Sequence, residues 1–335
     1  MIMFEAPNKT RVIPARFKRE SMDPRCRHSG MTLSRIVEFV QYILFRTLCF
    51  ILNLLPFSWA MKLGKWGGHF LYYILPKYRK VAFENARFAF AKEKSDHEIK
   101  RIVLQSFENL GLFTMEFVRI PKIVKNLNKY VVVQNDGPMF KTLERGKGVI
   151  FIVSHFGNWE WMAVAGGVLV REKGIKINAV ARPLGNSVLY RYVVRKFRGV
   201  TGLRTVDKKG AARETAKLLD QNEIVCILID QHERYGSVPV PYFGREAWTT
   251  SLPAVMALKK GAAVVPVFSS REKNKPTVVK FGEPFPVIQT GDYERDLVAN
   301  TAQYVKTIEE VVRKRPGDWL WMHARWRAFR TEKVK

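Results

Sequence analysis

The chain has 335 residues, of which 47% are hydrophobic and 26% charged, and this balance excludes a disordered or collagen-like protein. Its mean hydropathy of −0.14 excludes a polytopic membrane protein. Fifty-seven Lys and Arg residues against 30 Asp and Glu residues give a formal net charge of +27. That charge predicts a polyanionic partner, whether nucleic acid, an anionic membrane, a phosphorylated substrate or an acidic carrier protein.

The spacing of the cysteines and histidines predicts neither a disulfide framework nor a metal site. Cys26, Cys49 and Cys226 lie far apart and form no CxxC pair. The six histidines show neither HExxH nor HxxxH spacing, which removes the common helical metal site. The sequence also lacks GxSxG, GxGxxG and GxxxxGK, the signatures of nucleophile-elbow hydrolases, dinucleotide enzymes and P-loop NTPases. We therefore expect no metal and no cofactor.

The first part of the chain divides into a leader and a membrane-associated segment. Residues 1–31 are polar and basic and lack the apolar core of a secretory signal, so we expect a flexible basic leader. Residues 32–94 are expected to form a membrane-associated helical segment. Aromatic and basic residues recur between positions 59 and 80, as expected where a chain leaves lipid for an anionic surface.

Within that segment, the run Ile36–Phe57 is long and apolar enough to reach across a bilayer. However, it carries Glu38, Gln41, Arg46 and Asn53, which fall within a helical sector of roughly 140°. This pattern favours a helix with lipid on its broad apolar side and protein or lipid headgroups along the polar stripe. The alternative is an ordinary buried helix of a soluble protein.

From residue 95 onward, helix-like and strand-like segments alternate. We expect helices from Ser95, which opens a capping box with Glu98, to about Ile120, and near 158–172, 187–198, 210–221, 250–260 and Tyr293–Lys314. We expect strands at Tyr130–Gln134, Val149–Ser154, Ile177–Ala181, Ile224–Ile229, Ala263–Phe268 and Thr277–Phe281. The predicted fold is α/β, with a largely parallel central sheet flanked by helices, and residues 95–335 form one domain.

The most informative local pattern is a histidine that follows the apolar strand Val149–Ser154. His155 stands at the carboxyl end of this strand, the edge at which open α/β sheets bind ligands. Asn158 is expected to cap the next helix, whose first turn then carries Glu160 back toward the imidazole. A carboxylate on one ring nitrogen would leave the other to act as a general base. A capping histidine with an exposed glutamate is the alternative.

The segment HFGNWE, residues 155–160, resembles the H-x4-D/E motif of the lysophospholipid acyltransferase superfamily. The rest of the chain, from about Leu33 to Arg327, is similar to the lauroyl and myristoyl acyltransferases of its lipid A late-acyltransferase family. The supporting segments occur in the expected order: ARPLGN at 181–186, Asp230-Gln231, PYFGR at 241–245 with Thr249-Thr250, VVPV at 264–267, and WLWMHARW at 319–326.

The resemblance implies transfer of a fatty acyl chain from an acyl-carrier-protein thioester to a hydroxyl of a lipid A precursor. It places the catalytic domain on the cytoplasmic face of the cell inner membrane, with His155 as general base and Glu160 orienting it. An acidic carrier protein, a phosphorylated glycolipid and an anionic leaflet would each explain the positive charge, without nucleic acid. The backbone N–H groups of Gly157–Trp159 are candidate donors to the oxyanion.

Further residues are expected to bind the substrates. Arg182, Asn158, Asp230 and Arg245 are candidates for substrate binding; Arg182 and Arg245 suit a phosphate, while Asp230 would hold one of these arginines or form a structural salt bridge. A basic helical face is a candidate docking site for the carrier protein, with the alternative that it is merely solvated: Arg191, Arg195 and Arg198. The histidine and arginine at 323 and 325 either contact a sugar or pack among tryptophans.

Three other functions remain open on the sequence. The acceptor can be another glycolipid or a lysophospholipid, with acyl-CoA as donor. A basic membrane- or nucleic-acid-binding protein without catalysis would explain the charge, although it gives His155 and Glu160 no role. A metal-dependent hydrolase would use these two residues with Asp230 and His232, for which the sequence supplies no ligand spacing.

Overall fold

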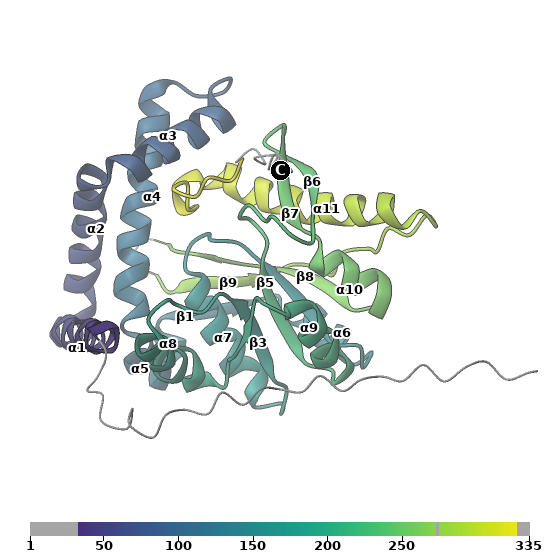
Figure 1. Ribbon diagram of the computed structural model, residues 1–335, viewed down its shortest axis with the longest axis horizontal. Helices are drawn as coiled ribbons and strands as arrows, with labels where there is room; N and C mark the ends of the chain where they lie inside the picture. The colour runs from purple at the N-terminus through teal and green to yellow at the C-terminus, as the bar shows by residue number, and fades with distance from the viewer. Residues whose placement is uncertain (1–32, 273–274, 327–335) are drawn as a thin grey trace, which may run out of the picture.

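The computed structural model describes residues 33–272 and 275–326 (Figure 1). The predicted leader, 1–31, lies outside the described residues. A mostly parallel central sheet with helices on both faces confirms the predicted α/β class. Its seven strands have the order β1-β9-β8-β2-β5-β3-β4. Their bounds are β1 Val131–Gln134, β9 Thr277–Phe281, β8 Ala263–Ser270, β2 Val149–Val153, β5 Ile224–Leu228, β3 Ile177–Ala181 and β4 Arg204–Asp207.

The direction of each strand decides which loops meet. Strands β8, β2, β5, β3 and β4 run parallel, whereas β9 is antiparallel to β8 and carries β1 parallel to itself at the sheet edge. Every residue of β2 is buried, as expected for an apolar strand covered on both faces. The carboxyl ends of β2, β5 and β3 therefore lie side by side at one edge of the sheet.

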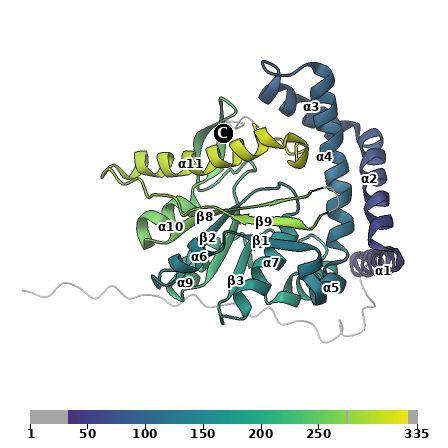
Figure 2. The same cartoon turned by 180° about the vertical axis from the view of Figure 1, so that it is seen from behind.

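Each face of the sheet carries its own apolar core. On one face, Ile150 and Ile152 of β2 pack with α9 (Ala211–Asp220), α10 (Leu252–Lys260) and α11 (Tyr293–Lys314). On the other face, Phe151 and Val153 pack with α6 (Gly137–Leu143) and α7 (Trp159–Arg171). The alternation along β2 follows from the period of two along a strand. Figure 2 shows α11 and α7 on opposite sides of the sheet.

All six strands expected from the sequence form, whereas β4 and the separate hairpin of β6 (Ser237–Tyr242) and β7 (Arg245–Thr250) were missed. Strand β4 is a short edge strand with polar residues at both ends. Strand β6 contains Pro239 and Pro241, which argue against a strand because proline donates no ladder hydrogen bond. A two-stranded ribbon tolerates these prolines because each strand has one edge whose backbone groups pair with no neighbouring strand.

In the part of the chain that the structure describes, four long helices precede the sheet: α1 (Leu33–Leu54), α2 (Phe57–Ile74), α3 (Pro76–Phe90) and α4 (Asp96–Phe117). Helix α4 begins with the predicted capping box, in which Ser95 Oγ accepts from Glu98 N–H at 3.3 Å and Glu98 accepts from Ser95 N–H at 2.8 Å. Both views show α2 alongside α4 at one side of the sheet (Figures 1 and 2). Short helices α5 (Ile120–Ile123) and α8 (Ser187–Val193) complete the layer near α1.

The polar stripe of α1 lies against protein, as the sequence predicts. Glu38 accepts from the hydroxyl of Ser187 at 2.9 Å, and the guanidinium of Arg46 lies 5.6 Å from the ring centre of Tyr192. The apolar side is exposed, and Leu54 is 68% exposed. Only 11% of the most apolar window of α1 is buried, so the alternative of an ordinary core helix does not hold. By length and composition, α1 is able to cross a membrane.

Glycines bring α2 into backbone contact with α4. A Cβ at Gly68 would lie 2.2 Å from the carbonyl oxygen of Phe107, and one at Gly111 would lie 2.0 Å from the carbonyl oxygen of Gly64. These distances leave no room for a methyl group, because the obstructing atoms are backbone. Helix α2 is thus fixed directly to α4.

Gly68→Ala is expected to lower the free energy of unfolding by about 1–3 kcal/mol, because the new methyl group overpacks the helix contact. The control is Gly67→Ala, where a Cβ meets nothing within 4 Å and the higher helix propensity of Ala is expected to stabilise by up to about 1 kcal/mol. Denaturant unfolding of both variants measures the difference. Equal effects at the two positions would contradict the close contact of α2 with α4.

Candidate active site

Two side chains from neighbouring strands meet at the carboxyl edge of the sheet. His155 follows β2 and Asp230 follows β5, and these strands pair in parallel register. The Nδ1 atom of His155 lies 2.9 Å from Oδ1 of Asp230, and the backbone N–H of His155 donates to Oδ2 at 2.7 Å. His155 is thereby held by both oxygens of one carboxylate, one at its ring and the other at its backbone N–H. Its side chain remains 19% exposed, while that of Asp230 is 1% exposed.

The partners of the imidazole assign its tautomer. A carboxylate can only accept, so the proton of His155 belongs on Nδ1. The amide Nε2 of Gln231 lies 3.3 Å from Nε2 of His155, and an amide NH2 can only donate. Nε2 therefore presents its lone pair, which is the form that a general base requires.

Asp230 is held ionised although it is 3% exposed. Burial would raise the pKa of this carboxyl, but the charge and hydrogen bonds of His155 and the indole N–H of Trp319 bring the pKa below its ordinary value. The indole Nε1 of Trp319 donates to Oδ2 at 2.7 Å. Sequence reasoning missed Trp319, because nothing in the chain indicates that residue 319 returns to the ends of β2 and β5.

The predicted pairing of Glu160 with His155 is wrong. The carboxylate of Glu160 is bound by Arg198 instead, at 3.1 Å from Nε and 2.5 Å from Nη2. Helix α7 begins at Trp159, so Glu160 lies in its first turn and points beneath the sheet edge, where Arg198 reaches it. The carboxylate that orients His155 comes from the next strand. Asp230 had also been expected to hold Arg182 or Arg245, and instead it holds His155.

Arg198 is not part of an exposed docking face. The turn Val194–Arg198 is a π-helix, which breaks the spacing that would have aligned it with Arg191 and Arg195. Its side chain is 19% exposed, and the buried carboxylate of Glu160 raises its pKa against the opposing effect of desolvation. Arg191 and Arg195 are exposed.

Asn158 caps α7 as predicted but does not face a substrate. It is 0% exposed; Oδ1 accepts from the N–H of Trp161 at 2.9 Å, and Nδ2 donates to Glu116 at 2.6 Å. Glu116 of α4 also accepts from Nε of Arg271 at 2.8 Å, so Asn158 belongs to a buried network that anchors the turn after β2. Its predicted role in substrate binding is therefore wrong.

Two of the candidate oxyanion donors are already used. The N–H of Gly157 donates to the carbonyl of Asp318 at 2.9 Å, and that of Asn158 donates to Oγ of Ser269 at 2.8 Å. These bonds fix the turn instead of leaving its N–H groups for a ligand. The amide of Gln231, beside the imidazole, is a side-chain donor placed where the sequence had not suggested one.

The two phosphate candidates lie in different places. Arg182 is exposed and follows β3, which is separated from β2 by β5 alone. At about 4.8 Å between neighbouring strands, the axes of β2 and β3 are about 10 Å apart, so Arg182 lies at the same edge as His155. Arg245 instead begins β7 at the hairpin turn, where its guanidinium lies 5.1 Å from the ring centre of Phe88.

The C-terminal segment forms part of the wall of the site. Arg325 is 0% exposed and donates to the carbonyls of Gln231 at 2.9 Å and Trp248 at 2.7 Å. It is thus a packing residue that ties the loop after β5 to β7, and burial lowers its pKa to about 10. Burial also lowers the pKa of His323 to about 4. Of the two alternatives for Arg325, contact with a sugar or packing in the protein interior, the second therefore holds.

An apolar cavity lies under the same edge of the sheet. Trp159, whose ring is 4.9 Å from that of His155, lines it at one end, and Glu160 and Arg198 also contribute to its wall. Its free space is about 50 Å³. The remaining wall is apolar and comes mainly from β2, β3, β5 and α7, including Phe151, Met162, Gly166, Ala179, Cys226 and Leu228.

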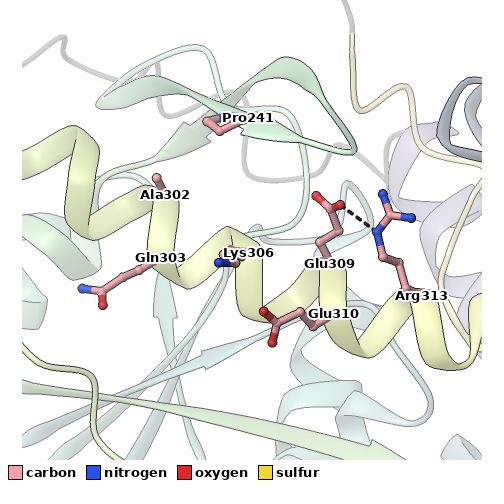
Figure 3. A pocket seen from close by; sticks show the side chains of 7 residues that line it. All are labelled: Pro241, Ala302, Gln303, Lys306, Glu309, Glu310 and Arg313. Atoms are coloured by element: carbon pink, nitrogen blue, oxygen red, sulfur yellow. Dashed lines mark hydrogen bonds and ion pairs between the residues drawn. The ribbon is translucent and has the colours of Figure 1, made fainter.

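A second hollow, of about 510 Å³, is open and lies between Pro241 of β6 and the exposed side of α11 (Figure 3). Its wall mixes charges of both signs, and Arg313 donates to Glu309, one turn away on α11, at 2.8 Å. None of its lining residues belongs to the edge that carries His155. Over residues 33–272 and 275–326, no group of three or more His, Cys, Asp or Glu side chains is placed to hold a metal ion, so the hydrolase alternative lacks its ligand set.

An imidazole oriented by a carboxylate beside an apolar cavity suits the transfer of a hydrophobic acyl group to a hydroxyl. Comparison with known families agrees with this class. Residues 30–328 match the model of the bacterial lipid A biosynthesis acyltransferases, so the chain belongs to this family and is an acyltransferase. The resemblance found in the sequence is thereby confirmed.

Curated relatives name a different acceptor. The chain is 24% identical over 241 residues to a phosphatidylinositol mannoside acyltransferase of Mycobacterium tuberculosis, covering 69% of this chain and 72% of the relative. It is also 24% identical over 230 residues to a protein of the same name from Mycolicibacterium smegmatis, covering 67% and 72% of the two chains.

The pKa of His323 predicts a pH dependence of stability. The unfolded chain takes up a proton near the ordinary value of 6.5, whereas the folded protein resists it down to about 4. The neutral imidazole thus stabilises the fold fully above about pH 6.5, and this contribution is lost as the pH falls toward 4.

Between pH 7 and pH 5, the melting temperature of wild type is expected to fall by a few degrees more than that of His323→Asn, because the variant no longer titrates. His97→Gln, at an exposed position in α4, is the control and should follow wild type. Differential scanning calorimetry at the two pH values measures the difference. A parallel decline of His323→Asn and wild type would contradict the buried neutral imidazole.

Proposed function

We propose that this enzyme transfers a fatty acyl chain from an acyl-carrier-protein thioester to a hydroxyl of a lipid A precursor. His155 acts as the general base, and Asp230 orients it. The observation that carries this proposal is the contact of Nδ1 with the Asp230 carboxylate, which leaves the lone pair of Nε2 free of that carboxylate on a side chain that is 19% exposed. Asp230 takes the role that the sequence had given to Glu160.

The proposed reaction needs no nucleophile from the protein. The acceptor hydroxyl replaces the amide of Gln231 at Nε2 of His155 and gives its proton to that nitrogen as its oxygen attacks the thioester carbonyl. The tetrahedral intermediate then collapses, the carbon–sulfur bond breaks, and the departing thiolate takes the proton from the imidazolium. The products are an ester and a free thiol. Asp230 stays ionised throughout and stabilises the imidazolium.

The apolar cavity supports the proposal as the place for the acyl chain. Trp159, whose ring lies next to the imidazole, lines it together with residues of β2, β3, β5 and α7. A single water occupies about 30 Å³, so a free space of about 50 Å³ does not hold a fatty chain unless the wall moves. The ion pair of Glu160 with Arg198 lies in that wall, and Arg198 belongs to the π-helical turn. In the proposal, this turn moves outward when the acyl chain enters the cavity.

The positive surface supports anionic substrates. Arg182, at the edge shared with His155, is placed for a phosphate of the glycolipid. Arg191 and Arg195 are exposed on the neighbouring helical segment and suit an acidic carrier protein. Arg245, on the hairpin, is not part of this arrangement.

Membrane attachment through α1 completes the proposal, with the catalytic domain on the cytoplasmic face of the inner membrane. The apolar side of α1 is exposed, and in α2 the residues Trp59, Trp66, Phe70 and Tyr73 lie on one helical face and are each more than 60% exposed. Aromatic side chains at such a surface favour the bilayer interface, and the net charge of +27 favours an anionic leaflet.

A second candidate acceptor has its own support. The curated relatives are named for phosphatidylinositol mannoside, which favours a different anionic glycolipid as acceptor. The alternative donor is the acyl-CoA considered from the sequence. The proposed base, cavity and cationic edge serve either acceptor, since each offers a sugar hydroxyl near a phosphate. The assay below therefore includes both acceptors and both donors.

Membranes that carry the enzyme are supplied with radiolabelled lipid A precursor or phosphatidylinositol mannoside, and with acyl-carrier-protein thioester or acyl-CoA. His155→Ala is expected to lower kcat by about 10²–10⁴-fold, because the hydroxyl loses its proton acceptor. Asp230→Asn should lower kcat by a similar factor, because an amide can favour the wrong tautomer of His155. Full activity of His155→Ala would end the proposal of a histidine base.

Glu160→Gln is the informative comparison. It leaves the contact of His155 with Asp230 intact but takes the charged partner from the buried guanidinium of Arg198. We expect it to lower the melting temperature and to leave kcat largely unchanged. If Glu160→Gln instead abolished transfer while Asp230→Asn remained active, the roles assigned here to the two carboxylates would be reversed.

The cavity makes a prediction about chain length. Gly166→Leu adds an isobutyl group to the wall, where a Cβ already meets the side chain of Ile177 at 3.1 Å. The variant is expected to prefer an acyl chain shorter by about two to four carbons, because bound volume is lost from the apolar space. Competition between donors of different length measures the preference. Ala216→Leu, a helix substitution outside the cavity, serves as control, and an unchanged preference in Gly166→Leu would place the acyl chain elsewhere.

A further inference from the structure

The indole of Trp319 completes the donors around the Asp230 carboxylate. Its Nε1–H donates to Oδ2 at 2.7 Å, and the backbone N–H of His155 donates to the same oxygen at 2.7 Å. Oδ1 faces Nδ1 of His155 at 2.9 Å. Trp319 is 1% exposed and Asp230 is 3% exposed, so these bonds form away from bulk water. Rotation of the carboxylate would break the bond to the indole and the bond to the imidazole together.

The backbone of Trp319 is joined to the strand end that carries the imidazole. Trp319 forms an antiparallel bridge with Phe156. On either side of that bridge, the N–H of Gly157 donates to the carbonyl of Asp318 at 2.9 Å, and the N–H of Leu320 donates to the carbonyl of His155 at 3.1 Å. The indole and the imidazole are therefore attached to one short hydrogen-bonded ladder.

The indole ring is also fixed from its other sides. Its centre lies 4.6 Å from that of Trp321 and 5.7 Å from that of Tyr242, both edge-to-face. The carbonyl of Trp319 accepts from the hydroxyl of Ser106, on α4, at 2.6 Å. The ring cannot turn away without disturbing this packing, so its N–H is a preorganised donor.

We propose that Trp319 is a positioning residue of the active site, whose indole N–H fixes the Asp230 carboxylate in the orientation that keeps the proton of His155 on Nδ1. The inference rests on the proposed role of His155 as the general base. A buried carboxylate that lost this donor would be harder to keep ionised and would be held by His155 alone. The base would then spend part of its time in the tautomer with its lone pair on the wrong nitrogen.

A neighbouring tryptophan provides a matched control. Trp321 is 0% exposed, and its indole donates to the carbonyl of Pro316 at 2.7 Å. Trp319→Phe and Trp321→Phe therefore each remove one buried indole N–H while keeping an aromatic ring. Only the first variant takes a donor from Asp230.

Trp319→Phe is expected to lower kcat by about 10–100-fold with the KM for the glycolipid unchanged, as for other groups that orient a catalytic ligand. The acid limb of its kcat–pH profile should move to higher pH, because loss of the donor raises the pKa of Asp230. Trp321→Phe should lower the melting temperature comparably but keep kcat within about threefold and leave the acid limb in place. If the two variants lost kcat equally and neither kcat–pH profile moved, the positioning role of Trp319 would be overturned.

A readout without turnover separates this inference from the proposed function. In protein with ¹⁵N-labelled histidine, the ring nitrogens of His155 are expected to report the Nδ1–H tautomer in wild type and a mixture in Trp319→Phe. If that variant does not fold, Ser106→Ala loosens the same indole and should shift the signals in the same direction. Unshifted signals in a folded variant would refute the positioning role. If the signals differ between wild type and Trp319→Phe as expected, but wild type transfers no acyl chain, only the proposed acyl transfer is refuted.

Discussion

The contact between His155 and Asp230 depends on the pairing of two strands. Because β2 and β5 are parallel and adjacent, their carboxyl ends emerge side by side, and the residues that follow each strand meet without a long loop. The backbone N–H of His155 and its ring then bond the same carboxylate. The geometry is thus set by the register of a buried sheet, which resists displacement better than a surface loop would.

That edge of the sheet is supported by one long helix. Helix α4 bonds the C-terminal segment through Ser106 and Asn109, which donate to the carbonyls of Trp319 and Asp318 at 2.6 and 3.0 Å. About two helical turns beyond Asn109, Glu116 binds the cap of α7. Charged and polar groups in this support are buried, and they are tolerated because each has partners. Elements from both ends of the chain therefore hold the turn that carries His155.

Apolar residues that recur every two positions in strands and every 3.6 positions in helices were sufficient to predict most of the fold. Helix α11 matches its predicted bounds Tyr293–Lys314, and the apolar runs of β2 and β5 form central strands, because burial on both faces leaves a strong signal. The hairpin β6–β7 was missed since its prolines counter the usual strand pattern. The polar stripe of α1 was predicted because its four polar residues fall within one sector of an otherwise apolar helix.

The site was predicted only in part, for a reason that lies in the nature of sequence motifs. His155 was recognised from its place after a buried strand, but a motif describes residues close in sequence, and it assigned the nearby Glu160 to the ring. The true neighbour, Asp230, is 75 positions away along the chain. The signal that could have found it was present: both residues follow predicted apolar strands of a parallel sheet, and such strands place the residues that follow them at the same edge. No comparable signal pointed to Trp319.

The backbone contact between α2 and α4 has a consequence for how the edge that carries His155 is held relative to the exposed aromatic face. Helix α2 carries the exposed aromatic face, and α4 carries the bonds that hold the turn after β2, so the two surfaces belong to one rigid unit. A surface that binds this aromatic face therefore holds the imidazole at a fixed distance, which the packed layers between them set.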